Sequence, residues 1–241
     1  YLVLPFCPEG SLVKWLSQLN GTGTPMLQPH QVMHIVQQAA DALDYAHDKQ
    51  IIHRDVKPSN FLIRSRKSTP DRPDLLLADF GIARFSQGTI NASKTIRGTP
   101  KYMAPEQWRG SPVPATDQYA LAVVAYELLT SRPPFLGTQE QVMYHHFLTQ
   151  PQPPSAVNTR ITPAIDAVIL QALAKQPEAR FPSISEFARA FQQAVTESGI
   201  TPVISITPSA PYMGTIVSSP MPVSTYPVSY THLTLPTILR V

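Results

Sequence analysis

The feature that most constrains this chain is the stretch over residues 51–63, which reads Ile-Ile-His-Arg-Asp-Val-Lys-Pro-Ser-Asn-Phe-Leu-Ile. Two short apolar runs, 51–52 and 61–63, enclose a loop in which most side chains are polar or charged. Burying such a loop without partners is unfavourable, so it must be a functional site or lie on the surface. We predict that the two apolar runs form small strands that hold the ends of the loop.

The polar residues of this loop follow the spacing His-Arg-Asp-x-Lys-x-x-Asn, in which Asp55, Lys57 and Asn60 carry the chemistry. A carboxylate can orient an attacking hydroxyl and accept its proton, and a lysine can face a phosphate that is being transferred. The amide oxygen of an asparagine suits a hard metal ion such as Mg²⁺. Any one of these residues would fit a charged surface loop equally well. The combination argues against a surface loop, because further motifs follow in register.

Two such motifs follow in the order found in one known family. Residues 75–78 are apolar and lead into Asp-Phe-Gly at 79–81, and a polar stretch over 82–99 leads into Gly-Thr-Pro-Lys-Tyr-Met-Ala-Pro-Glu, which ends at Glu106. With the loop at 51–63, they resemble the catalytic loop, the metal-binding motif and the activation segment of protein kinases. The chain resembles in particular the bacterial eukaryotic-like Ser/Thr protein kinases, as a large-lobe fragment that lacks most of the N-terminal lobe.

The resemblance assigns a role to each catalytic residue. It makes Asp55 the base that orients the substrate hydroxyl, places Lys57 against the transferred phosphate, and gives Asn60 and Asp79 to Mg²⁺. Thr99 is expected to hydrogen-bond toward Asp55 and Lys57, and its presence with Lys57 favours Ser or Thr over Tyr as the acceptor. The cofactors implied are ATP and Mg²⁺.

The first residues of the chain resemble the strand and hinge that hold the adenine of ATP in kinases. Leu4 falls at the gatekeeper position, and the backbone of Pro5 and Cys7 would bind the base, with Leu62 and Ala78 completing the nucleotide site. Proline is harmless where only a carbonyl is used. Without the later motifs, an edge strand ending at a proline would explain this segment equally well. Cys7 is expected to act through its backbone, since no neighbour would lower the pKa of its thiol.

Helical periodicity covers most of the remaining chain and predicts a mainly α fold with short β-hairpins. Over residues 28–50 the apolar residues recur every three or four positions, which predicts a long helix with one buried stripe. Residues 116–129 are apolar on all sides, as in a helix at the centre of a core. Further helices are expected at 11–19, capped by Ser11, and at 139–149, 163–175 and 183–196. This pattern completes the protein-kinase C-terminal (large) lobe, followed by a disordered tail.

Three ionisable residues of the helical part are expected to hold the site in place. Asp117 matches the aspartate by which the central helix of the family binds the backbone of the catalytic loop. An acid in the first turn of a helix is an equally good explanation for it. Glu106 and Arg180 are predicted to form a buried ion pair, because burying either one alone is unfavourable.

Arg54 precedes Asp55, and in the family this arginine marks kinases whose activation segment is ordered by phosphorylation. A phosphate adds about −1.5 to −2 charges and can bind a waiting arginine. The residues expected to carry it are Thr89, Ser93 and Thr95.

Composition argues against several other classes. The net charge of +3 comes from scattered basic residues, so no nucleic-acid partner is expected. No apolar run is long enough to span a membrane, and the single cysteine suits a cytoplasmic location, with any membrane anchor of the parent protein in a segment missing here. The histidines of the long helix, His30, His34 and His47, lack metal-ligand spacing and are predicted to be surface or capping residues.

Changes in composition divide the chain into four parts. Residues 1–7 resemble the last small-lobe strand and hinge, and 8–195 the large lobe. Residues 196–227 are rich in Pro, Ser and Thr, which predicts a disordered linker. Residues 228–237 resemble a translated sequencing-library adapter, and residues 228–241 are therefore expected to be a non-native tail. Since the chain begins at the hinge, the phosphate-gripping elements of the family are missing, and the fragment itself is expected to be inactive.

The function predicted for the parent protein is transfer of the ATP γ-phosphate to Ser/Thr hydroxyls of proteins. Its expected partners are protein substrates with Ser or Thr acceptors, and a second copy of the kinase in a homodimer for autophosphorylation. Two alternatives stay open. One is a small-molecule kinase, against which the substrate-facing motif at 98–106 argues. The other is a pseudokinase-like docking module, inactive as this fragment.

Overall fold

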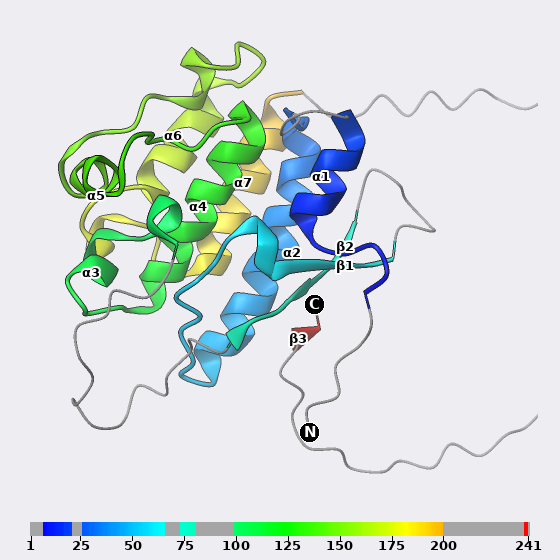
Figure 1. Ribbon diagram of the computed structural model, residues 1–241. Coiled ribbons are helices and arrows are strands. Elements are labelled where there is room, and N and C mark those ends of the chain that lie inside the picture. The colour runs from blue at the N-terminus through cyan, green and yellow to red at the C-terminus, as the bar shows by residue number, and fades with distance from the viewer. Residues whose placement is uncertain (1–6, 21–25, 66–72, 81–98, 200–238, 241) are drawn as a thin grey trace, which may run out of the picture.

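The structure of this chain is a computed structural model that describes residues 7–20, 26–65, 73–80, 99–199 and 239–240. Figure 1 shows a helical body with a small sheet along one side. The helices are α1 (Leu12–Asn20), α2 (Pro29–Asp48), α3 (Pro105–Trp108), α4 (Pro114–Thr130), α5 (Gln139–Leu148), α6 (Pro163–Ala172) and α7 (Ile184–Glu197). The strands are β1 (Phe61–Ser65), β2 (Asp74–Leu77) and β3 (Leu239–Arg240), and short 3₁₀ turns lie at η1 (Pro58–Asn60), η3 (Pro100–Tyr102), η4 (Pro154–Ala156) and η5 (Pro177–Ala179). The mainly α class is confirmed.

Helix α4 forms the centre of the core. Its residues from Thr116 to Thr130 are all buried, and several of its polar side chains make hydrogen bonds to other elements. It packs against α2, α6 and α7, which surround it in Figure 1. Because the helix is covered on all sides, it needs no polar face, and the prediction of a core helix is confirmed.

Helix α2 lies beside α4 with one apolar stripe turned inward. The helix also packs against α7 and β2, so it joins the helical body to the sheet. It begins at Pro29, where the missing N–H of a proline does no harm. It ends at Asp48, slightly before the predicted end at residue 50, because Gln50 has a left-handed backbone with φ of 59°. The predicted stripe is buried throughout and consists of Val32, Ile35, Val36, Ala39, Leu43 and Ala46.

Strands β1 and β2 form an antiparallel hairpin, and β3 adds two residues alongside β2. The register pairs Phe61 with Leu77, and a bulge interrupts it between Ile63 and Ser65. Phe61 and Ile63 are fully buried and belong to the main core. The hairpin therefore fixes the end of the catalytic loop against the helical body.

The strand predicted at residues 51–52 is wrong. Ile51 takes part only in an isolated β-bridge, and Ile52 belongs to no strand. The backbone N–H of Ile51 donates to the carbonyl of Ala46 at 2.9 Å, so this segment closes the end of α2. Its apolar character reflects burial, since Ile52 is 7% exposed.

Two smaller differences concern the helices α6 and α3. Helix α6 ends at Ala172 rather than at the predicted residue 175, because Leu173 has left the helical conformation, with ψ of 11°. Helix α3 has no counterpart among the predicted elements, since four residues are too few to show helical periodicity.

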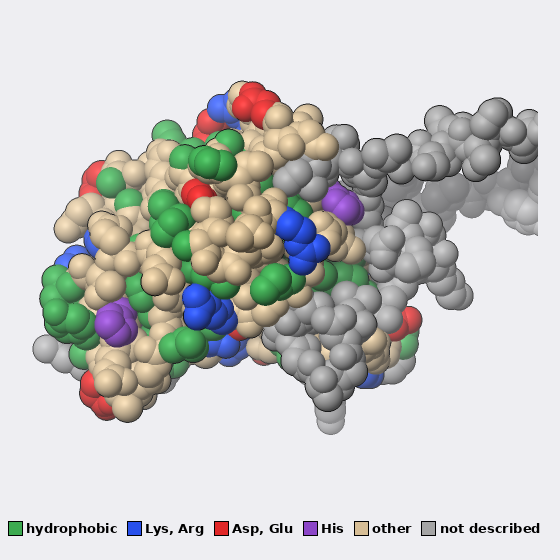
Figure 2. Space-filling view, turned by 90° about the horizontal axis from the view of Figure 1, so that it is seen from above, with side chains coloured by type: hydrophobic (Ala, Val, Ile, Leu, Met, Phe, Trp, Pro, Cys, Tyr) green, Lys and Arg blue, Asp and Glu red, His purple; other side chains and the backbone are tan. Residues whose placement is uncertain are grey.

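Several predicted features lie outside the described residues. They are Leu4, Pro5, Thr89, Ser93 and Thr95, with residues 200–238 of the linker and tail. Among the helices of the described part, none combines the length and the apolar character needed to cross a bilayer. On the face drawn in Figure 2, the Lys and Arg side chains of the described residues are separated by neutral ones and form no continuous stripe.

Candidate active site

One carboxylate of the central helix α4 binds the backbone of the catalytic loop. Asp117 is fully buried, and its Oδ2 and Oδ1 accept the backbone N–H groups of His53 and Arg54, each at 2.8 Å. His47 Nε2 lies 2.8 Å from the same Oδ2. Asp117 is in the first turn of α4, but its contacts show that it binds the loop backbone. His47 thus supports the loop, which goes beyond the capping or surface role predicted for it.

Arg54 has a strained backbone that two neighbours hold in place. Its φ of 67° lies in the left-handed region, which a residue with a side chain rarely adopts. Its N–H is fixed by Asp117, and its carbonyl accepts a hydrogen bond from Gln107 Nε2 at 2.7 Å. The conformation turns the chain sharply just before Asp55.

His53 joins the catalytic loop to the Asp-Phe-Gly segment. Its Nε2 lies 2.9 Å from the carbonyl of Ala78, and its ring packs edge-on against Phe80 with centroids 4.8 Å apart. The N–H of Ala78 donates to the carbonyl of Asn60 at 2.8 Å. Asp79, the residue after Ala78, is exposed and has φ of 65°. Because Phe61 pairs with Leu77, Asn60 and Asp79 lie at neighbouring ends of β1 and β2.

Asp55 lies at the centre of a compact polar cluster. Its carboxylate is buried, with Lys57 Nζ 2.7 Å from Oδ2. Its Oδ1 accepts hydrogen bonds from the hydroxyl and the N–H of Thr99, at 3.1 and 3.2 Å. Lys57 Nζ also donates to the Thr99 hydroxyl at 2.9 Å. Three of the four residues that the sequence assigns to catalysis, Asp55, Lys57 and Thr99, thus contact one another, and the lysine charge offsets the burial of the carboxylate.

Asn60 is oriented by Asp55 in a way that leaves an oxygen for a metal ion. Its Nδ2 donates to the backbone carbonyl of Asp55 at 2.8 Å and lies 3.3 Å from Oδ2. Its Oδ1 accepts the Ser59 hydroxyl at 3.3 Å, the one contact of this oxygen among the described residues. Mg²⁺ is commonly held by one or two carboxylates, phosphate oxygens and water rather than by a full protein cage. The oxygens of Asn60 and Asp79 fit this pattern, and among the described residues no three His, Cys, Asp or Glu side chains are grouped so that they could hold a metal ion by themselves.

The predicted nucleotide residues that are described lie close to β1. The carbonyl of Cys7 accepts the N–H of Gly10 at 3.0 Å, and the carbonyl of Gly10 accepts the N–H of Ile63 at 2.8 Å. The segment that starts at Cys7 therefore runs beside the strand that carries Leu62. Burial raises the pKa of the Cys7 thiol, which supports a role for its backbone rather than for a thiolate.

The segment after Thr99 is tied to the large lobe by the predicted ion pair. Arg180 Nη1 and Nη2 lie 2.7 and 2.8 Å from the two carboxylate oxygens of Glu106, and the arginine side chain is fully buried. Arg180 also donates to the carbonyls of Ala174 and Ala115, each at 2.8 Å. The Thr116 hydroxyl gives Glu106 a further hydrogen bond at 2.9 Å. Every guanidinium nitrogen of Arg180 and both carboxylate oxygens of Glu106 thus have a hydrogen-bond partner.

The turn η3 is fixed by a histidine that the sequence does not single out. His146 is fully buried, with Nδ1 2.9 Å from the Tyr119 hydroxyl and Nε2 3.2 Å from the carbonyl of Lys101. Burial, with the charge of Lys175 nearby, lowers the pKa of His146 to about 3. The ring is therefore neutral at pH 7 and acts as a hydrogen-bonding bridge between α4, α5 and η3.

The low pKa of His146 predicts that the chain becomes less stable in acid. Between its ordinary pKa of 6.5 and the folded value of about 3, the unfolded chain binds a proton that the folded chain does not. The free energy of unfolding should therefore fall as the pH is lowered through this window, by up to about 1.4 kcal/mol per pH unit. The variant His146→Gln cannot titrate and should lose less stability over the same range. Urea unfolding of both chains at several pH values measures the difference, and parallel pH profiles would contradict the prediction.

Comparisons with known proteins agree with this site. The protein kinase domain family matches residues 1–193. The serine/threonine-protein kinase Pkn1 of Myxococcus xanthus is 41% identical over 203 residues, which are 82% of this chain and 28% of that protein. The serine/threonine-protein kinase PknB of Mycobacterium leprae is 38% identical over 190 residues, 77% of this chain and 29% of that protein. The chain thus spans less than a third of these two relatives.

Solved structures give the same result. A crystal structure of a mutant PknI kinase domain from Mycobacterium tuberculosis matches with a TM-score of 0.56 and 32% sequence identity, over 77% of this chain and 62% of that one. The family match covers most of the chain, and it includes every motif that forms the cluster around Asp55. The chain therefore belongs to the protein kinase family, among the bacterial eukaryotic-like Ser/Thr kinases.

Proposed function

We propose that the protein containing this chain transfers the γ-phosphate of ATP to Ser and Thr hydroxyls of other proteins. The observation that carries the proposal is the cluster of Asp55, Lys57 and Thr99, in which a buried carboxylate contacts a lysine at 2.7 Å and a threonine hydroxyl at 3.1 Å. The relatives named above are serine/threonine-protein kinases. Because this chain spans less than a third of their length, the activity of the whole protein is inferred from them.

In this proposal, Asp55 orients the acceptor hydroxyl and takes its proton during transfer. Lys57 faces the phosphoryl oxygens, where its charge stabilises the negative charge that develops. The hydroxyl and N–H of Thr99 hold one carboxylate oxygen, so the base keeps a fixed orientation. The direct contact between Lys57 and Thr99 supports Ser and Thr as acceptors.

We assign the metal to Asn60 and Asp79, and the adenine to Leu4, Pro5 and the backbone of Cys7. Bound Mg²⁺ supplies charge neutralisation for the ATP phosphates. Asn60 Oδ1 and the exposed Asp79 carboxylate would hold it, at the neighbouring ends of two paired strands.

We also assign the faces of Leu62 and Ala78 to the nucleotide, and residues 8–195 to the large lobe of the kinase. Leu62 pairs with Leu76 across the hairpin, and the N–H of Ala78 bonds Asn60, so both residues sit beside the metal-binding groups. A pseudokinase-like docking module is the second candidate. Such a module would not need catalytic groups, yet Asp55, Lys57 and Thr99 are present and in contact.

The test uses a fused kinase, in which the small lobe of a matched relative precedes Tyr1. The fused kinase is incubated with labelled ATP and a protein substrate, with and without Mg²⁺, and the product is hydrolysed to identify the phosphorylated amino acid. We expect transfer that requires Mg²⁺ and yields phosphoserine or phosphothreonine. A folded fusion that binds ATP without transfer would favour the docking module, and phosphotyrosine as the main product would contradict the proposed acceptor. Addition of a second, inactive copy tests whether one copy phosphorylates another in a homodimer.

A further inference from the structure

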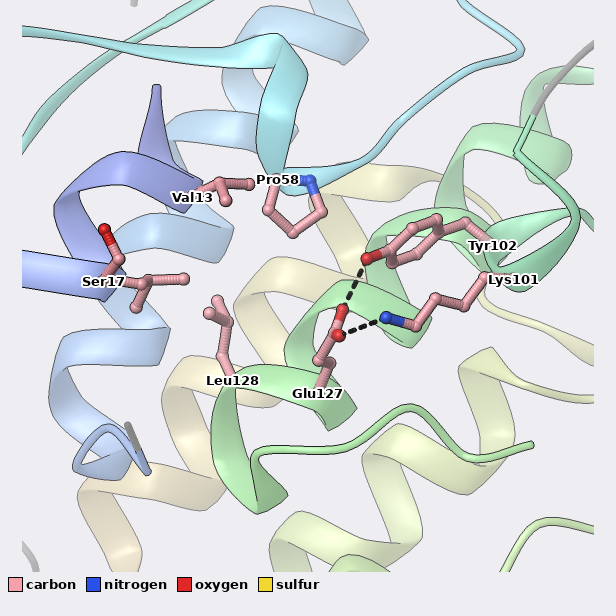
Figure 3. Close-up of a pocket in the computed structure, with 8 residues that line it drawn as sticks. Val13, Ser17, Pro58, Lys101, Tyr102, Glu127 and Leu128 are labelled. Carbon is pink, nitrogen blue, oxygen red and sulfur yellow. Dashed lines mark hydrogen bonds and ion pairs between the residues drawn. The ribbon is translucent and has the colours of Figure 1, made fainter. Parts of the chain in front are cut away.

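A pocket of about 330 Å³ lies between α1, η1, η3 and the end of α4, apart from the cluster around Asp55. Figure 3 shows Val13 and Leu128 on one side of it and Tyr102 with Lys101 on the other. Leu16 and Pro58 add further apolar surface. Val13 is about half exposed, so the apolar wall continues to the outside of the pocket.

The pocket is connected to the catalytic cluster through the chain on two sides. Pro58 directly follows Lys57, and Lys101 lies two residues after Thr99. Two Cα–Cα steps cover at most about 7.6 Å, so the pocket wall starts close to the groups that contact Asp55. An extended peptide advances roughly 3.3 Å per residue. A substrate with its hydroxyl at Asp55 can therefore place a side chain from a nearby position in this pocket.

Glu127, the acidic residue in the lining of the pocket, is paired with two other residues of the lining. Glu127 is 7% exposed, and its two oxygens are occupied by Lys101 Nζ at 2.7 Å and by the Tyr102 hydroxyl at 2.6 Å. The dashed lines in Figure 3 mark both contacts. Burial, followed by the charge of Glu127, raises the pKa of Tyr102, so its hydroxyl remains a donor. An incoming cation would have to displace Lys101 to reach the carboxylate.

Lys101 stands at the edge of the pocket on a fixed backbone. Its carbonyl is held by His146, and the N–H of Tyr102 closes the turn onto the carbonyl of Thr99 at 2.9 Å. The lysine side chain is 40% exposed, and its Nζ also lies 5.6 Å from the centre of the Tyr102 ring. The amine is therefore part of the pocket wall and within reach of a bound side chain.

We propose that this pocket is a substrate subsite for an uncharged apolar side chain of the peptide, and that Lys101 is the residue that excludes Lys and Arg from it. The inference rests on the proposed protein kinase function. Apolar walls favour an apolar side chain. Lys101 and Tyr102 occupy the carboxylate of Glu127, so a basic side chain finds no free anionic partner in the pocket.

The variant Lys101→Met tests this assignment. Methionine keeps most of the length of the side chain but lacks the amine, so it uncovers one oxygen of Glu127. The test uses a set of peptides that share one Ser at a constant position. Either Leu or Arg is placed in turn at each position within about four residues of this Ser. Binding is measured by fluorescence anisotropy on the full chain, and transfer is measured in the fused kinase. At one position the unmodified protein should prefer Leu, and Lys101→Met should shift the Leu-to-Arg ratio toward Arg by about five- to tenfold.

Two further variants separate the explanations. Lys14→Met removes an exposed lysine from α1 that does not line the pocket, and it should leave the ratio unchanged. Adding Glu127→Gln to Lys101→Met should remove the gain in Arg binding, because the new partner of the arginine is lost. Equal Leu-to-Arg ratios in the unmodified protein and Lys101→Met, or no positional preference in binding, would overturn the subsite. A binding preference that shifts as expected without any transfer would support the subsite and contradict the catalytic proposal alone.

Discussion

The variant Asp55→Asn is expected to lower the turnover of the fused kinase by about 10²–10⁴-fold, the usual contribution of a positioned general base. Asparagine has nearly the same shape as aspartate, so its Oδ1 can still accept the N–H of Thr99. It cannot accept the proton of a substrate hydroxyl, and it no longer carries the charge that Lys57 Nζ contacts at 2.7 Å. Initial rates at saturating ATP and substrate measure the loss.

A matched control separates chemistry from folding. Asp41→Asn makes the same exchange at an exposed position of α2, where the carboxylate bonds only Gln37 in the described contacts, at 3.0 Å. It should leave the turnover unchanged. Thermal unfolding of Asp55→Asn checks that the variant remains folded. Turnover within a few-fold of the unmodified fused kinase would show that Asp55 is not the base.

The polar cluster around Asp55 was predictable because most of its residues lie in one short stretch of sequence. Asp55, Lys57 and Asn60 lie within six residues, and few other functions need these three side chains together. Thr99 is distant in the sequence, and its contact with Asp55 was expected only through the resemblance to kinases. The ion pair of Glu106 and Arg180 was predictable on physical grounds, because neither charge is easily buried alone.

The supporting contacts could not be predicted, because no local pattern distinguishes them. Gln107 bonds the carbonyl of Arg54 across 53 positions, and His146 bonds Lys101 across 45. A glutamine or a histidine in an amphipathic helix usually faces solvent, and only the packing of α3 and α5 turns these two inward. His47 is a similar case, since its partner Asp117 lies 70 positions away.

Helices were predicted better than strands for a related reason. A helix repeats its apolar pattern over many residues, so the buried stripe of α2 is visible in the sequence. The apolar pair at 51–52 contains too few residues to separate a strand from a buried turn. In the structure, the hydrogen bond from Ile51 to Ala46 decides for the turn.

The variant Arg180→Met is expected to reduce the free energy of unfolding of the chain by about 3–5 kcal/mol, as for other broken buried ion pairs. Methionine fills much of the same space but donates no hydrogen bond. Glu106, which is 5% exposed, would keep only the Thr116 hydroxyl as a partner. The carbonyls of Ala174 and Ala115 would also lose the hydrogen bonds that they accept from Arg180. Urea unfolding measures the free energy, and thermal unfolding should show a fall of about 2–4 °C in Tm per kcal/mol.

The chain offers a control with the same chemistry on its surface. Arg189 pairs with Glu186 on α7, where both side chains are largely exposed, and Arg189→Met should change the stability little. Adding Glu106→Gln to Arg180→Met should recover part of the loss, because a buried amide is less unfavourable than an unpaired carboxylate. If Arg180→Met were as stable as Arg189→Met, the buried pair would not stabilise the lobe. If the double variant were no more stable than Arg180→Met, the loss would come from the missing hydrogen bonds of Arg180 to the carbonyls of Ala174 and Ala115 rather than from the carboxylate of Glu106.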